Sequence, residues 1–218
     1  MKKTTAFFIL IPLFFILNSC IGMSINIQMN KDGSGKIVME YRVSQTFQNL
    51  GTLDGNEAMP SVPLSRDDWK KMVDRIPGLK LASFSTKKDK QDTVISVTLE
   101  FKEEEALLAF LDPIGEKIML KRLDASGTLE IIIISEPEPF LDDDKYMDMI
   151  KMLFEGYNFT FGFKAPGNSV LAIIDGKGNP VSTPPSAEAV LAGKNVTITI
   201  PMADLFDIKD GLGVRFIW

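Results

Sequence analysis

The densest group of side chains that could do chemistry is acidic. Five carboxylates lie within nine positions: Glu136, Glu138, Asp142, Asp143 and Asp144. Oxygen ligands of this kind bind hard cations such as Ca²⁺ and Mg²⁺. Acids at the start of a helix also stabilise free N–H groups and the positive end of the helix dipole without a metal. Both interpretations stay open, and the first predicts a calcium or magnesium site with a carboxylate as general base.

An apolar segment follows these acids. We expect a helix over 142–155 that carries Met147, Met149, Met152 and Phe154, and then a strand with Tyr157, Phe159, Phe161 and Phe163 on one face. Methionines adapt to irregular apolar ligands, and aromatic rings supply large contact areas. These residues are therefore candidates for binding a lipid or another amphipathic ligand. The alternative is a buried helix packed over a sheet.

The composition excludes several kinds of chemistry. The chain has no histidine, which removes Ser-His-Asp catalysis and imidazole-based zinc sites. Its only cysteine is Cys20, so no intrachain disulfide can form. The formal net charge is -5. Binding to nucleic acid draws on clustered cations, so no nucleic-acid partner is expected.

One motif resembles half of a calcium-binding loop. Asn30, Asp32 and Ser34 alternate, and Gly35 is the sixth residue of the motif. The twelfth residue should be a bidentate glutamate and is Tyr41 instead. Strand-like alternation flanks the motif on both sides, so we predict a hairpin turn rather than a calcium site.

The N-terminus resembles the signal of a bacterial lipoprotein. Lys2 and Lys3 precede the apolar run Ala6–Leu17, and Leu17-Asn18-Ser19-Cys20 is similar to a lipobox. The resemblance implies that Cys20 is alkylated by a diacylglyceryl group, that the chain is cut before it and that the new amine is acylated, commonly with palmitate. We therefore expect a signal peptide over 1–19, a lipidated tether over 20–24 and one domain over 25–218. The expected location is the bacterial cell envelope, on either membrane or at the surface.

The periodicity beyond residue 24 predicts an α+β domain with a largely antiparallel sheet and about three helices. The expected helices begin at Ser65, Glu103 and Asp142, and each is followed by a pair of strands. Ser65 and Asp68 fit a capping box. A helix–hairpin unit would thus recur three times, and residues 176–194 are expected to form a loop.

A second resemblance rests on turns and strands. The Asp-Gly-Ser-Gly hairpin, the run Tyr157-Asn158-Phe159-Thr160-Phe161, the turn Ala165-Pro166-Gly167-Asn168 and the strand from Val196 to Pro201 are similar to the mycobacterial and spirochaetal lipoproteins with an LppM-type domain. The resemblance implies an α+β lipoprotein that contacts lipid or the envelope.

Two classes of function follow. The first is a non-catalytic, membrane-anchored lipoprotein whose domain binds an amphipathic ligand or perturbs membranes. The second is a metal-dependent hydrolase that acts on phospholipid through the acids at 136–144. A plain interaction protein of the envelope, or an adhesin, is a further alternative.

Overall fold

The structure is a computed structural model that describes residues 21–44, 63–90, 92–112, 118–123, 126–134, 148, 151, 154–167 and 170–218. The described chain is mostly β, with a seven-stranded and a four-stranded sheet. It contains two α-helices of eight residues each and one short 3-10 helix. The predicted α+β class with about three helices is therefore wrong. The strands pair across long sequence separations into two broad sheets, and the two short helices only cover part of one face.

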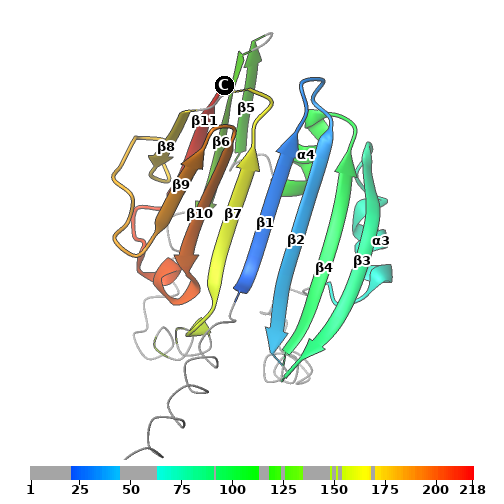
Figure 1. The fold of residues 1–218 in the computed structure, drawn as a ribbon. Coiled ribbons are helices and arrows are strands. Elements are labelled where there is room, and N and C mark those ends of the chain that lie inside the picture. The colour runs from blue at the N-terminus through cyan, green and yellow to red at the C-terminus, as the bar shows by residue number, and fades with distance from the viewer. Residues whose placement is uncertain are drawn as a thin grey trace, which may run out of the picture.

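The larger sheet has the order β3-β4-β2-β1-β7-β10-β9. Its strands are β1 (Ile21–Met29), β2 (Gly35–Ser44), β3 (Leu79–Asp89), β4 (Asp92–Phe101), β7 (Asn158–Lys164), β9 (Glu188–Ala192) and β10 (Asn195–Pro201). Only β1 and β7 pair in parallel, and the other neighbours are antiparallel. The sheet spans the front of Figure 1, from β3 at one edge to β9 at the other.

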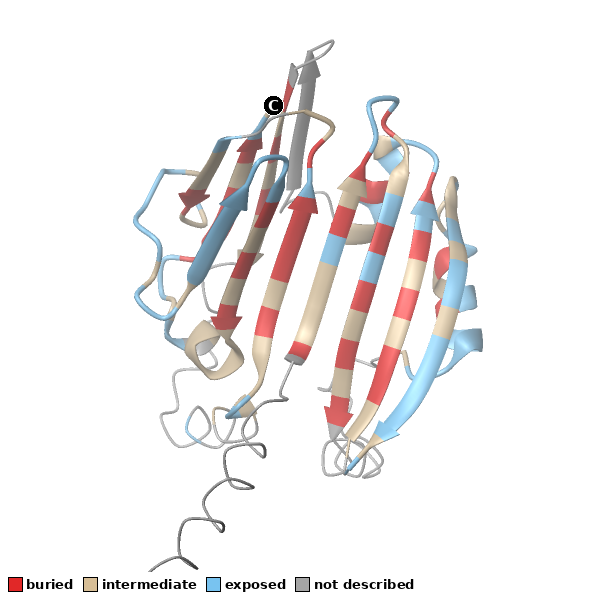
Figure 2. Cartoon of the chain, in the orientation of Figure 1, coloured by how far each residue is buried: buried red, intermediate tan, exposed pale blue. Residues whose placement is uncertain are grey.

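Strict alternation along these strands gives the sheet two different faces. On β1 and β2, the apolar pairs Ile27↔Ile37 and Ile25↔Met39 alternate with polar positions. Figure 2 shows the result as bands of buried residues across the strands. The apolar side forms the inner face of the sheet, and the polar side forms an outer face.

The smaller sheet has the order β5-β6-β11-β8 and lies behind the left half of the larger one (Figure 1). Its strands are β5 (Ile118–Leu123), β6 (Ser126–Ile134), β8 (Val170–Ile174) and β11 (Leu212–Ile217). Phe216 on β11 stacks against Phe163 of the larger sheet, with ring centroids 4.5 Å apart. The two sheets therefore share one apolar core.

Two helices lie behind the right half of the larger sheet (Figure 1): α3 (Arg66–Val73) and α4 (Glu104–Leu111). The predicted capping box is confirmed, since Asp68 N–H donates to Ser65 Oγ at 3.1 Å and the Asp68 carboxylate accepts from Ser65. Trp69 points inward and is 2% exposed. No helix among the described residues is long and apolar enough to cross a bilayer.

The structure confirms one local expectation and corrects several others. The hairpin at 30–34 is confirmed, because β1 and β2 pair directly around it. Residues 21–24 belong to β1 rather than to a tether. The strands of the expected third helix–hairpin unit do not pair, since β7 and β8 lie in different sheets, and its expected helix over 142–155 lies mostly outside the described residues. Strand β9 and the 3-10 helix η2 (Met202–Asp207) lie where no regular element was expected.

Candidate functional site

The aromatic stripe predicted to bind a ligand lies in the core. Phe159, Phe161 and Phe163 are 8%, 3% and 1% exposed. Phe161 and Phe163 both contact Phe216 of the smaller sheet, with ring centroids 6.2 and 4.5 Å apart. These side chains are therefore buried in the packing between the two sheets. A ligand could reach them only if the sheets separated.

The other predicted site residues have varied positions. Phe154 is half-buried, and Tyr157 is partly buried with its hydroxyl directed at Asp92. Cys20 and the remaining candidates lie outside the described residues: Met147, Met149, Met152, Glu136, Glu138, Asp142, Asp143 and Asp144. Within the part of the chain that the structure describes, no group of three acids or cysteines could hold a metal ion.

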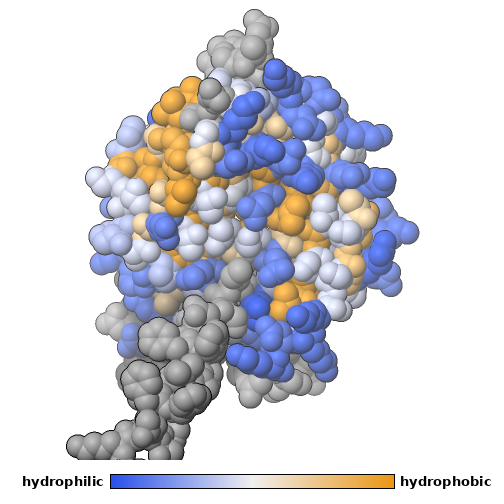
Figure 3. Space-filling view, viewed as in Figure 1, coloured by the Kyte–Doolittle hydropathy of each residue, from blue (hydrophilic) through white to orange (hydrophobic). Residues whose placement is uncertain are grey.

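The larger sheet has an outer face that neither the helices nor the second sheet covers (Figure 1). Its outward side chains are mostly uncharged and polar, with scattered charges and a few valines. Figure 3 shows this face, where pale and blue side chains surround separate apolar patches. An uncovered face of this size offers a broad surface to a ligand.

A depression of about 300 Å³ lies on this face over β2, β1, β7 and β10. The strand register builds it from two adjacent rows of residues. One row runs Lys36–Gln28–Lys164–Asn195, and the next runs Val38–Asn26–Gly162–Thr197. Two lysines thus flank a glutamine, and two further amides, a threonine hydroxyl and a valine lie beside them in the lining.

Gly162 lies beneath the Asn26 side chain in the depression. A Cβ at this position would clash with Asn26 Oδ1 and would lie 3.1 Å from Asn26 Cγ. The Asn26 amide therefore lies across β7, and its Nδ2 donates to Ser24 Oγ at 2.9 Å. The Asn26 side chain therefore accounts for the glycine at 162, because it fills the space that a larger residue there would take.

The charge of the depression is positive. Lys36 and Lys164 are exposed and make no ion pair within the described structure. Across the strand order they are separated by β1, so their backbones are about 10 Å apart at the usual strand spacing. An anion placed over Gln28 would lie between the two ammonium groups and beside the amide donors.

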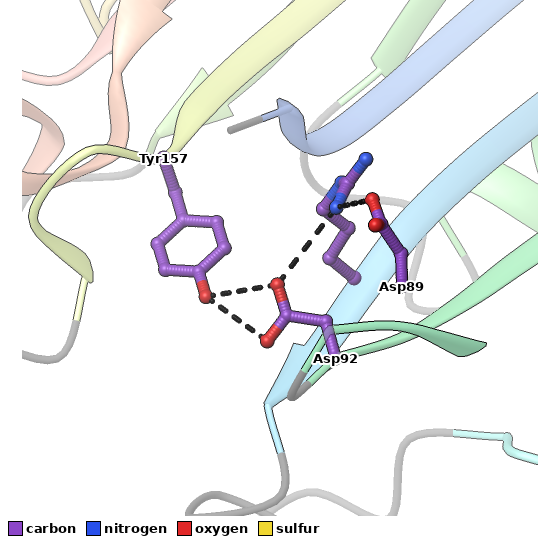
Figure 4. Close-up of polar contacts among 4 residues, drawn as sticks. Asp89, Asp92 and Tyr157 are labelled. Carbon is purple, nitrogen blue, oxygen red and sulfur yellow. Dashed lines mark hydrogen bonds and ion pairs between the residues drawn. The ribbon is translucent and has the colours of Figure 1, made fainter. Parts of the chain in front are cut away.

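A second polar cluster lies at the end of the sheet where β1 begins. Arg42 Nη1 donates to Asp89 Oδ2 at 2.8 Å and lies 3.9 Å from Asp92 Oδ2. Tyr157 OH donates to Asp92 Oδ2 at 3.2 Å, and Figure 4 shows these groups converging from three strands and the residue before β7. The hydrogen bond from Arg42 holds the pKa of Asp89 below its usual value. This cluster ties the residue before β7 to the β3–β4 hairpin.

Sequence reasoning missed the depression because no local motif marks it. Its residues come from four strands, and each is an ordinary outward position of an alternating pattern. The available signal was Gly162 within a strand, opposite uncharged polar residues. Comparisons with protein-family models, curated protein sequences and solved structures find no match for this chain.

Proposed function

We propose that this chain is a lipid-anchored envelope protein that binds an anionic, amphipathic ligand on the outer face of its larger sheet. The observation that carries the binding role is the depression at Gly162, where two unpaired lysines flank Gln28. A carboxylate or phosphate would accept charge-assisted hydrogen bonds from them. Val38, 38% exposed, offers an apolar contact beside that anion.

The proposed anchor is Cys20, because the charged start, the apolar run and the lipobox-like tetrapeptide all precede it. In bacteria that express the chain, Cys20→Ala is expected to abolish labelling by a fatty-acid analogue and to leave residues 1–19 attached. Metabolic labelling and intact-protein mass measure both effects. Label that persists on the variant would contradict the anchor.

The binding role is tested with Lys36→Gln combined with Lys164→Gln. Two exposed charge-assisted contacts contribute about 1 kcal/mol each, so we expect the double variant to weaken binding of octanoate by about tenfold or more. Isothermal titration calorimetry on the full chain measures this affinity. The detergent concentration is kept low enough that micelles do not take up the octanoate. Inorganic phosphate, titrated in parallel, separates recognition of the anion from recognition of the apolar tail.

The matched control is Lys80→Gln. Lys80 is a lysine of the same sheet that lies 3.9 Å from Glu100, two strands from Lys36 and outside the lining of the depression. Its replacement should leave the affinity unchanged. Equal affinity in the double variant and the unmodified chain, or an equal loss in the Lys80 control, would overturn the assignment of the depression as the ligand site.

A further inference from the structure

The proposed anchor leaves no spacer between lipid and fold. Strand β1 begins at Ile21, the residue that follows Cys20. A lipid attached to Cys20 would therefore be joined to the first residue of a central strand of the larger sheet. The end of the sheet where β1 begins would have to lie at the bilayer surface.

The start of β1 is also held firmly. Gly22 is buried, and a Cβ there would lie 2.7 Å from Tyr157 Cβ and would clash with Met202 Sδ. Tyr157 extends from this point to Asp92, which begins β4. The second residue after the anchor is thus packed against groups that reach the β3–β4 hairpin, which limits how far the domain can turn about its attachment point.

The β3–β4 hairpin lies at the same end of the sheet (Figure 1). The strand register places the start of β1 level with the hairpin end of β3. Met23 pairs with Tyr41, Tyr41 pairs with Ile95, and Ile95 pairs with Thr86. Three strand spacings separate β1 from β3, which is about 14 Å. Both the anchor and the hairpin can therefore touch one flat surface.

The hairpin is locally basic although the chain is acidic. Its two acids, Asp89 and Asp92, lie 2.8 and 3.9 Å from the guanidinium of Arg42. Lys87, Lys88 and Lys90 are exposed, and none makes an ion pair with a described residue. The tip of the hairpin thus carries a net positive charge at the end of the sheet that the anchor brings to the membrane.

We infer that the β3–β4 hairpin docks on anionic phospholipid headgroups and fixes how the anchored domain stands on the bilayer. The inference rests on the proposed anchor at Cys20. Lysines near an anionic surface are attracted within about one Debye length, roughly 10 Å at moderate salt. The depression would then lie well away from the lipid, because Gln28 is seven residues along β1 from Ile21, or about 23 Å.

The test measures the reactivity of individual lysines. The full, lipidated protein is reconstituted in vesicles of phosphatidylcholine alone or of phosphatidylcholine mixed with phosphatidylglycerol. It is then labelled briefly with a water-soluble acetylating reagent and digested for mass spectrometry. We expect Lys87, Lys88 and Lys90 to react about fivefold more slowly on the anionic vesicles, and high salt to remove the difference.

Lys80 is the internal control, since it lies on the same strand as Lys87 but at its opposite end. Its reactivity should be the same on both vesicles. Equal reactivity of the hairpin lysines on both vesicles, or equal protection of Lys80, would overturn the inference. Intact mass shows separately whether Cys20 is lipidated. If it is not, the full chain is coupled through its only thiol to maleimide lipids, and the same labelling decides the orientation.

Discussion

Replacement of Phe163 by alanine is expected to lower the free energy of unfolding by about 3–5 kcal/mol. Phe163 is 1% exposed and contacts the rings of Phe216 and Trp218, with centroids 4.5 and 6.1 Å away. Truncation leaves a cavity between the two sheets and removes contacts on both sides. Denaturant unfolding followed by tryptophan fluorescence measures the loss, since Trp218 adjoins the altered position.

A suitable control is Leu191→Ala on β9, where the side chain is 51% exposed. Its removal should change stability by no more than about 0.5 kcal/mol, as is usual for surface positions. The difference in stability between Phe163→Ala and Leu191→Ala distinguishes the loss of core packing from a general loss of apolar surface. A similar small loss for Phe163→Ala would mean that the aromatic stripe is not the contact between the sheets.

Trp69→Ala is expected to cost about 3–5 kcal/mol and to detach α3 from the sheet. The indole is 2% exposed, and its Nε1–H donates to Tyr41 OH at 3.0 Å. Its ring also lies 6.3 Å from that of Phe110 on α4. Tyr41 OH in turn donates to the carbonyl of Pro63, so the variant disturbs the segment before the helix as well.

Trp69→Phe separates the two contributions of the indole. The phenyl ring keeps most of the packing but has no donor for Tyr41 OH, so the expected loss is about 1–2 kcal/mol. Chemical denaturation measures the stability of both variants, and hydrogen exchange of the α3 amides reports detachment of the helix. Protection of those amides that is unchanged in Trp69→Ala would contradict the anchoring role.

The stability predictions and the binding proposals concern opposite faces of one sheet. Phe163 points into the core, while its neighbour Lys164 lies at the edge of the depression. A variant on the inner face should therefore change stability, and one on the outer face should change binding. This separation makes failures of folding easy to distinguish from losses of the site.

Local sequence alone determined much of the secondary structure. The alternation around Asp32–Gly35 predicted the β1–β2 hairpin, and Ser65 with Asp68 predicted the start of α3. Both depend on residues within a few positions of one another. Such short-range signals survive without knowledge of the fold, because strand alternation and helix capping are properties of the local backbone.

The partners of each strand were decided only by the tertiary structure. Tyr157–Lys164 was expected beside 169–174 but pairs instead with β1, in parallel, and with β10. Whether its phenylalanines meet a ligand or a second sheet depends on β11, more than 45 residues later in the chain. The depression likewise exists only because four strands from distant segments bring Lys36, Gly162 and Lys164 together. A period of two assigns side chains to two faces, but long-range packing determines which face is covered and which stays open to a ligand.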